Sequence, residues 1–335
     1  MDKKNTTLTV SYTEDKKIMV SICCITYNQE QYIAQTIESF LMQKVDFKYE
    51  ILINDDASTD RTADIIREYE KKYPDIIKPI YQSINQYSRG ITNPSGAFNY
   101  PRASGKYIAM CEGDDYWTDI YKLKKQVDFL ESHKNCSLCL HAAKTLVVDG
   151  SFTGSIIRPY NKSRFISTGE VIDKSSAYPT ASLMFRSCFA RHMPDYYTNC
   201  PVGDIPLQLH LASMGRVYYM DEVMSVYRIG GKASWSVLMK KGDYKKKQEI
   251  YYKQMKIMYI EFDRASKGRY TNYIKNAIRR IRFLTYVNTK NYSRIFSSKY
   301  RRFYKELDLR TRFFTGFEYH FPFLYSVARY IMRCI

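Results

Sequence analysis

Residues 106–117 of this 335-residue chain read Lys-Tyr-Ile-Ala-Met-Cys-Glu-Gly-Asp-Asp-Tyr-Trp. This acidic stretch is the reference point for interpreting the rest of the sequence. Residues 106–110 are apolar enough to predict a short buried strand. Glu112, Asp114 and Asp115 then follow within four residues. Carboxylates this close raise one another's pKa, and a divalent cation such as Mg²⁺ or Mn²⁺ relieves the repulsion. The stretch is therefore a candidate metal site or, alternatively, a solvated acidic turn that caps the next helix.

The region before this stretch predicts alternating strands and helices. Three mostly apolar runs predict strands, and two runs with apolar residues at helical spacing lie between them. The strands are residues 17–25, 49–53 and 76–82, and the helices are residues 30–42 and 61–72. This alternation predicts an α/β fold with a mostly parallel, mixed sheet flanked by helices.

Polar residues stand where three of these strands end. Thr26, Tyr27 and Asn28 follow the first strand, and Asp55 and Asp56 follow the second. The acidic stretch at 112–115 follows a third. Because ligands of such sheets bind beyond the carboxyl ends of the strands, we expect these groups to converge on one edge. That convergence favours a metal and diphosphate site over an acidic turn.

The second half of the chain predicts further strands at residues 135–148, 181–186 and 216–227. A helix is predicted over residues 207–214, and Gly215 ends it. Asp204 stands just before this helix. Asp204 is either an N-cap or a functional carboxylate, and the sequence leaves both interpretations open.

The order and spacing of these motifs over residues 18–230 resemble glycosyltransferase family 2. The resemblance implies the GT-A fold, with a nucleotide-sugar half at residues 18–118 and an acceptor half at residues 119–236. Residues 1–17 then form a polar N-terminal segment. Residues 237–335 form a C-terminal helical basic extension.

The resemblance also implies roles for individual residues. Asp204 would be the catalytic base, and Asp114 would ligate Mn²⁺ or Mg²⁺ in the family's DXD motif. The motif departs from the family pattern at Glu112, where the family has Asp. The remaining positions would bind the nucleotide sugar, and they are Thr26, Tyr27, Asn28, Asp55, Asp56, Glu112, Gly113 and Asp115.

The activity that the resemblance implies is inverting, non-processive transfer of a sugar. The donor would be a nucleotide diphosphate sugar, most simply a UDP-sugar, and the acceptor a glycan or lipid-linked hydroxyl. The Gln-x-x-Arg-Trp element of processive synthases is absent, because neither Trp117 nor Trp235 follows an arginine. Two rivals remain, a non-catalytic nucleotide-binding or scaffold protein and a nucleotidyltransferase. The second rival normally has a glycine-rich loop after the first strand, where this chain has residues 26–29 without glycine.

Positive charge is concentrated in the C-terminal part of the chain. Residues 241–335 hold 23 Lys and Arg against 7 Asp and Glu, whereas residues 1–240 hold 29 against 27. Residues 274–284 predict a basic amphipathic helix, and residues 313–333 combine aromatic with basic side chains. This pattern favours an anionic membrane surface as partner. The alternative is that these helices pack on the catalytic domain. No nucleic-acid motif is present.

Cysteine usage and the N-terminus predict a cytoplasmic protein on the inner face of the cell membrane. Cys136, Cys139 and His141 have metal-like spacing, but no second ligand pair follows them, so zinc is not expected. Residues 1–17 lack the apolar core of a signal peptide, and no uncharged apolar run is long enough to span a bilayer. We therefore expect reduced cysteines and peripheral association.

Overall fold

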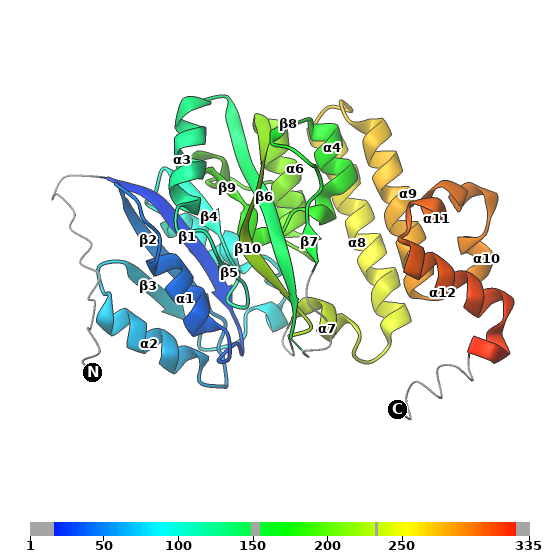
Figure 1. The fold of residues 1–335 in the computed structure, drawn as a ribbon, viewed down its shortest axis with the longest axis horizontal. Helices are drawn as coiled ribbons and strands as arrows, with labels where there is room; N and C mark the ends of the chain where they lie inside the picture. Colours follow the sequence, from blue (N-terminus) through cyan, green and yellow to red (C-terminus); the bar gives the residue numbers. More distant parts are fainter. Residues whose placement is uncertain (1–16, 149–154, 232–233, 326–335) are drawn as a thin grey trace. The chain divides into compact units, whose positions relative to one another are not determined.

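The structure is a computed structural model that describes residues 17–148, 155–231 and 234–325. The chain forms two compact units, Met1–Leu238 and Met239–Ile335 (Figure 1). The sequence placed the division after residue 236. Each unit has its own helices, and each is described by itself.

The first unit contains one sheet with helices packed around it (Figure 1). Its strands are β1 Ile18–Thr26, β2 Lys48–Asp55, β3 Ile77–Tyr81, β4 Tyr107–Met110, β5 Tyr116–Trp117, β6 Cys136–Val147, β7 Ile156–Ile157, β8 Arg164–Ile166, β9 Met184–Arg186 and β10 Arg216–Ile229. Its helices are α1 Ile33–Leu41, α2 Thr62–Lys72, α3 Lys122–Ser132, α4 Thr168–Lys174, α5 Asp195–Thr198, α6 Asp204–Met214 and α7 Trp235–Met239. The predicted fold class, α/β with a mostly parallel mixed sheet, is confirmed.

The sheet joins two parallel blocks through one antiparallel strand. The order is β3-β2-β1-β4-β9-β6-β10-β5. Neighbours within β3-β2-β1-β4 and the pair β6-β10 are parallel, whereas β9 runs antiparallel to both β4 and β6. The short strand β9 therefore brings the second half of the chain beside the first.

Two sequence predictions need correction. The predicted strand 181–186 begins only at Met184, because Thr180–Ser182 forms a 3₁₀ turn. Helix α6 begins at Asp204 rather than at residue 207, and Gly203 occupies its N-cap. Asp204 is therefore not an N-cap. The acidic stretch caps no helix either, because α3 starts at Lys122 after the intervening strand β5.

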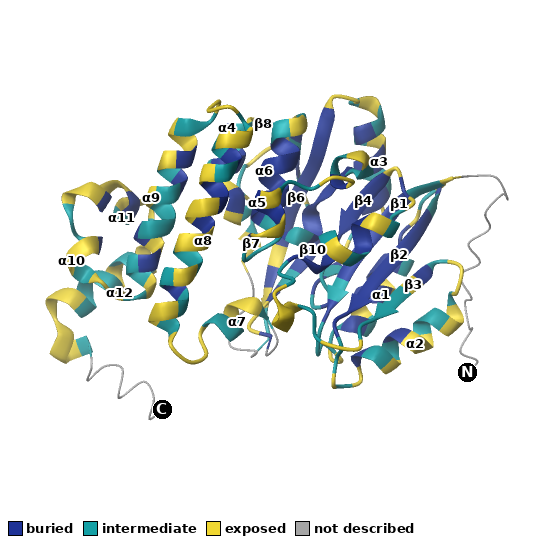
Figure 2. Cartoon of the chain, turned by 180° about the vertical axis from the view of Figure 1, so that it is seen from behind, coloured by how far each residue is buried: buried dark blue, intermediate teal, exposed yellow. Residues whose placement is uncertain are grey.

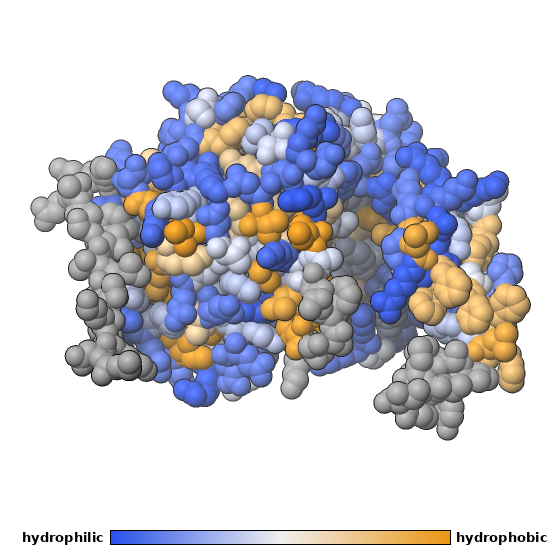
Figure 3. All heavy atoms as spheres, viewed as in Figure 1, coloured by the Kyte–Doolittle hydropathy of each residue, from blue (hydrophilic) through white to orange (hydrophobic). Residues whose placement is uncertain are grey.

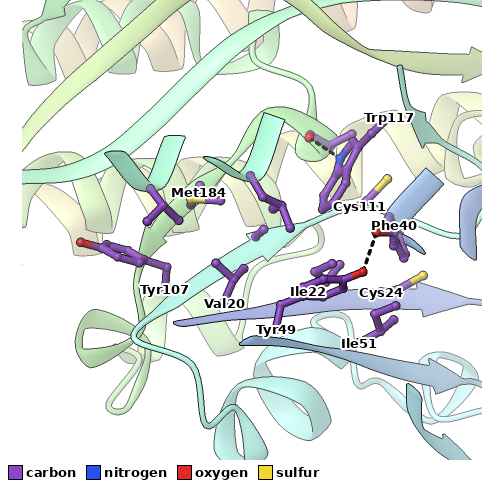
Figure 4. Packing of buried hydrophobic residues seen from close by; sticks show 14 of the residues in the cluster. Val20, Ile22, Cys24, Phe40, Tyr49, Ile51, Tyr107, Cys111, Trp117 and Met184 are labelled. Carbon is purple, nitrogen blue, oxygen red and sulfur yellow. Dashed lines mark hydrogen bonds between the residues drawn. The ribbon is translucent and has the colours of Figure 1, made fainter. Parts of the chain in front are cut away.

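The hydrophobic core lies against the strands that lead into the acidic stretch (Figures 2 and 4). Trp117 is buried, with its ring centroid 4.7 Å from that of Phe40. Its Nε1 donates to the carbonyl oxygen of Ala181 at 3.0 Å. Tyr49 donates its hydroxyl to the carbonyl oxygen of Phe40 at 3.2 Å (Figure 4). Trp117 thus fixes the end of the acidic stretch to the core.

The second unit is helical. Its helices are α8 Tyr244–Ala265, α9 Thr271–Asn288, α10 Tyr292–Ile295, α11 Arg301–Glu306 and α12 Leu309–His320. Helices α8 and α9 pack on each other. A small apolar cluster of Phe283, Ile295, Tyr300 and Phe303 joins α9 to the shorter helices.

Candidate active site

The acidic stretch continues from β4 alongside the end of β1. Gly113 donates its N–H to the carbonyl oxygen of Ile25 at 2.9 Å. The Thr36 hydroxyl lies within hydrogen-bonding distance of the carbonyl oxygens of Gly113 and Asp115, at 2.9 and 2.7 Å, and can share its one hydrogen between them. A Cβ atom at position 113 would meet the side chains of Gln29 and Thr26 closer than real Cβ atoms approach. Position 113 therefore has room only for glycine, which lets the chain pass next to Thr26.

Asp115 points into the protein rather than toward the open edge. Its side chain is 1% exposed, and its Oδ1 accepts the backbone N–H of Arg228 at 2.8 Å. Burial, followed by the charges of Asp114 and Glu112, raises its pKa well above the usual value. Asp115 therefore links the acidic stretch to β10, and a direct contact with the nucleotide sugar stays a prediction.

Arg228 holds the acidic stretch from the opposite side. Its guanidinium donates to the carbonyl oxygen of Asp114 and to the side-chain oxygen of Gln35. The same group lies between two aromatic rings, 4.8 Å from the centroid of Tyr32 and 4.6 Å from that of Tyr116. Such stacking is favourable for a guanidinium. The position of Asp114 thus depends on a residue more than a hundred positions away in the sequence.

Glu112 and Asp114 remain partly exposed, unlike Asp115. The pKa of Glu112 is raised to about 8, mainly by burial and then by the negative charges of Asp114 and Asp204. A hydrogen bond from the Thr180 side chain lowers this pKa and so partly opposes the shift. Burial also raises the pKa of Asp114, although Arg228 and Gln29 oppose the shift. Both carboxyls would ionise more readily beside a cation.

Asp204 reaches the same place from α6. Its negative charge acts on both Glu112 and Tyr227, so the three side chains lie within electrostatic range of one another. Burial is the main cause of the raised pKa of Asp204. The structure therefore brings Asp204 near Glu112, where its charge adds to burial and to Asp114 in raising the pKa of that carboxyl.

The ends of β1 and β2 complete this edge. Thr26 pairs with Asp55 in the parallel register, and the N–H of Asp56 donates to the carbonyl oxygen of Thr26 at 3.0 Å. Asn28 has a positive φ of 51° and donates its N–H to the Ser58 hydroxyl at 2.9 Å. Tyr27 is partly exposed. The strand-end residues thus form one connected rim.

The carboxylates of Asp55 and Asp56 already accept hydrogen bonds from the protein. Asp55 accepts from the hydroxyl of Ser58 at 2.5 Å. Asp56 accepts the backbone N–H groups of Gln86 and Tyr87 at 2.7 and 3.0 Å. These bonds shape the loops around the edge, and the contacts with base and ribose stay predictions.

The sequence missed several residues that surround the acids. Gln29 directly follows Thr26, Tyr27 and Asn28, and Tyr227 ends the predicted strand at residues 216–227. Their positions beside these motifs could have indicated that they border the acids. Thr180 gave no signal, because it lies in a short turn between elements.

A family model described as "Glycosyl transferase family 2" matches residues 21–192, which is half of the chain. The chain belongs to glycosyl transferase family 2. Among curated relatives, the family 2 chain is 34% identical to uncharacterized protein Rv1520 of Mycobacterium tuberculosis over 221 residues, 64% of this chain and 60% of the relative. It is 28% identical to the putative teichuronic acid biosynthesis glycosyltransferase TuaG of Bacillus subtilis over 272 residues, 79% of this chain and 98% of TuaG.

Solved structures share the fold of this family 2 chain. Staphylococcus aureus TarS 1–349, solved with UDP-GlcNAc, has a TM-score of 0.56 at 17% identity, covering 88% of this chain and 77% of TarS. The mannosyltransferase PcManGT of Pyrobaculum calidifontis, solved with GDP-Man and Mn²⁺, has a TM-score of 0.51 at 13% identity, covering 95% of this chain and 87% of PcManGT. The predicted GT-A fold is confirmed. The chain spans about 60% of the length of the curated relatives matched first.

The carboxylate oxygens at this family 2 site fit a hard divalent cation that a bound phosphate group helps to hold. Within residues 17–148, 155–231 and 234–325, no three His, Cys, Asp or Glu side chains are grouped so that they could hold a metal by themselves. Mg²⁺ and Mn²⁺ are often held by one or two carboxylates, with substrate phosphates completing the shell. Glu112 and Asp114, whose pKa values are raised, are the carboxylates available for that role.

Proposed function

We propose that this chain is an inverting, non-processive glycosyltransferase that moves a sugar from a nucleotide diphosphate sugar to an acceptor hydroxyl. One observation carries the proposal. Asp204, at the first turn of α6, lies near Glu112, whose pKa is raised by burial and by the charges of Asp114 and Asp204, although 91 residues separate Asp204 and Glu112 in the sequence. A base and a diphosphate site must lie near each other for transfer between two bound substrates.

The donor would lie along the rim formed by the ends of β1, β2 and β4. Thr26, Tyr27, Asn28, Asp55 and Asp56 would bind the nucleoside. Glu112 and Gly113 would adjoin the diphosphate and sugar, while Asp115 would support them from below. A UDP-sugar is the first candidate, because TarS was solved with UDP-GlcNAc. PcManGT was solved with GDP-Man, so a guanosine donor is the second candidate.

Asp114 would hold Mn²⁺ or Mg²⁺, with Glu112 near enough to assist. When bound, the cation neutralises charge that develops on the leaving diphosphate. Arg228 keeps the backbone of Asp114 in place through its hydrogen bond to the Asp114 carbonyl oxygen.

Asp204 would act as general base. The acceptor hydroxyl would attack the anomeric carbon, and the bond from that carbon to the diphosphate oxygen would break with its electron pair leaving on the nucleoside diphosphate. The hydroxyl proton would pass to Asp204. The raised pKa of Asp204, caused mainly by burial, makes it a stronger base than an exposed aspartate. A single displacement of this kind inverts the anomeric centre.

The acceptor would be a growing surface glycan or a lipid-linked sugar, and nucleic acid is not expected. TuaG is named for teichuronic acid biosynthesis, a function that fits such an acceptor. No helix within the described part of the chain is long and apolar enough to cross a bilayer. We propose that the protein works on the inner face of the cell membrane, held there by its basic C-terminal unit.

Screening nucleotide sugars with and without Mn²⁺ tests this function. We expect one donor to raise the melting temperature through binding to the folded state, and to be hydrolysed slowly or transferred when acceptor is added. Binding without any turnover across acceptors would instead indicate the scaffold alternative. Release of pyrophosphate from a nucleoside triphosphate and a sugar phosphate would indicate a nucleotidyltransferase.

A further inference from the structure

Helix α12 has an apolar surface that the described part of the second unit leaves exposed. None of its twelve residues is buried, although it carries Leu309, Phe313, Phe314 and Phe317. Leu309 is 77% exposed and Phe313 is 64% exposed. An isolated helix of this length is marginally stable in water, and contiguous exposed apolar surface marks an interaction site.

The aromatic side chains of this helix form a continuous row. The ring centroids of Phe313 and Phe317 lie 5.8 Å apart, and those of Phe317 and Phe321 lie 5.7 Å apart. Phe314 lies edge-on to Phe313 at 5.5 Å. Beyond the helix, Phe323 is 77% exposed. Apolar residues gather on this part of the second unit in Figure 3.

Helix α9, which the sequence predicted as a basic amphipathic helix, behaves differently. Its apolar residues Ile274, Ala277 and Phe283 are buried within the second unit. These residues pack against neighbours within the second unit, including α8. The alternative drawn from the sequence, that the C-terminal helices pack on the catalytic domain, stays a prediction.

The charge around α12 indicates what would cover it. Arg310 is exposed on the helix itself. The nearby acids are already engaged: Glu306 pairs with Arg280 and Arg302, Glu318 pairs with Lys290, and Asp308 caps the helix by accepting the N–H of Thr311. A second copy would bring the same excess of Lys and Arg against itself and would be repelled. An anionic lipid surface would be attracted.

A cavity of about 340 Å³ opens beside this row, lined from α9, α10 and α12. Arg310 and the hydroxyl-bearing residues Thr311 and Thr315 contribute to its wall, whereas Lys290 is neutralised there by Glu318 at 2.5 Å. A phosphate headgroup could therefore approach Arg310 while acyl chains meet the aromatic row.

We propose that α12 and residues 321–325 dock on an anionic lipid bilayer, with Phe313, Phe317, Phe321 and Phe323 in the interface and Arg310 at the headgroups. Aromatic rings prefer this depth, and combined apolar and electrostatic contacts give reversible binding. Docking would bring the active site to a lipid-linked acceptor, and this part of the proposal rests on the proposed function. Binding itself requires neither donor nor catalysis.

Co-sedimentation of the full chain with vesicles tests the proposal. We expect strong binding to vesicles of phosphatidylcholine with 30% phosphatidylglycerol, weak binding to phosphatidylcholine alone, and release by high salt. Replacing Phe313 and Phe321 together by Ala should lower the partition coefficient at least tenfold. The matched control replaces Ile257 and Ile260, which are exposed on α8, and should change it less than twofold.

Three outcomes would overturn the proposal. Unchanged vesicle binding in the double Phe variant would show that the row does not contact lipid. A lower melting temperature with unchanged binding would show that the row packs inside the protein. Concentration-dependent dimers that the variant abolishes, again with unchanged binding, would show that a second copy covers it. As an independent measurement, Phe321→Trp fluorescence should be quenched by brominated lipids, whereas Ile257→Trp fluorescence should not.

Discussion

The buried side-chain amide of Asn93 donates a hydrogen bond to the backbone carbonyl oxygen of Tyr197, with 2.5 Å between the two atoms. Thr92 makes a parallel contact, from its hydroxyl to the carbonyl oxygen of Cys200 at 2.5 Å. These bonds tie the loop that follows β3 to the segment that leads into Asp204. A Cβ atom at Gly203 would collide with the Asn93 side chain, so the two segments fit closely.

We expect Asn93→Ala to lower the rate of transfer by about tenfold or more with little change in KM for the donor, because a small displacement of the base is costly. It should also destabilise the fold by about 1 kcal/mol, since the carbonyl oxygen of Tyr197 loses its short bond from Asn93 and keeps only the longer one from the N–H of Cys200 at 3.4 Å. Steady-state kinetics and urea unfolding measure both effects. Asn199→Ala, an exposed change on the same segment, should leave both unchanged. Equal effects from the two variants would contradict the positioning role.

Replacing Asp204 by Asn should remove the base while keeping the shape of the side chain. Transfer should fall by about 10²–10⁴-fold, and donor binding should persist, because Asp204 acts on the acceptor proton. Single-turnover assays and calorimetry separate the two quantities. Asp195→Asn, at an exposed position on α5, is the control. Near wild-type transfer by the Asp204 variant would show that another group takes the proton.

Replacing Asp114 by Asn should abolish the part of donor binding that depends on Mn²⁺. A neutral amide cannot supply the charge that holds the cation against the diphosphate. Titration of the nucleoside diphosphate in the presence of Mn²⁺ or of a chelator measures this difference. Asp128→Asn, an exposed change on α3, should retain the full Mn²⁺ effect. A retained Mn²⁺ effect in the Asp114 variant would remove Asp114 from the metal site.

Loss of Arg228 should loosen the acidic stretch. Arg228→Met gives up two hydrogen bonds and the contacts with Tyr32 and Tyr116, so we expect a loss of about 2–4 kcal/mol in unfolding free energy. Donor affinity should fall in parallel. Arg228→Lys should recover part of the stability but less of the binding, because an ammonium cannot form both hydrogen bonds while stacked. Arg191→Met, at an exposed site, is the control.

Lys122 provides a test of stability against pH. It is fully buried, its Nζ lacks a hydrogen-bond partner among the described residues, and burial lowers its pKa to about 7. The ring of Trp117, whose centroid lies 3.9 Å from Nζ, opposes this shift by favouring the charged form. Below about pH 7, Lys122 is charged in both the folded and the unfolded protein, so folding must bury its charge. Between about pH 7 and the ordinary lysine pKa of 10.5, Lys122 is charged only in the unfolded protein and loses its proton on folding.

We therefore expect Lys122→Met to stabilise the protein most below about pH 7, by about 3–5 kcal/mol in unfolding free energy. This magnitude follows from the lowered pKa of Lys122, because each pKa unit corresponds to about 1.4 kcal/mol. The gain should shrink steadily as the pH rises toward 10.5, because the wild type then becomes more stable. Urea unfolding at several pH values measures it. Lys124→Met, on the exposed side of α3, should show no such trend. A gain that does not vary with pH would mean that Lys122 is charged throughout.

The sequence predicted most of the sheet and the place of the acidic stretch. Runs such as residues 17–25 and 49–53 are mostly apolar because most residues of β1 and β2 are buried, so composition reveals them. Prediction from the sequence was less accurate for short elements. Thr180–Ser182 turns before β9 begins, and three residues carry too little periodicity to show where one state ends.

The sequence by itself determined which residue types stand at the ends of β1, β2 and β4 and where positive charge accumulates, because these follow from local order along the chain. Only the tertiary structure decided that Asp115 turns inward to Arg228 and that the charge of Asp204 reaches Glu112. It also decided that α9 buries Ile274, Ala277 and Phe283 while α12 buries none of its residues. Burial and charge interaction depend on neighbours brought together by folding. Between residues 112 and 204, that neighbourhood depends on strand β9, whose antiparallel pairing with β4 and β6 no local pattern specifies.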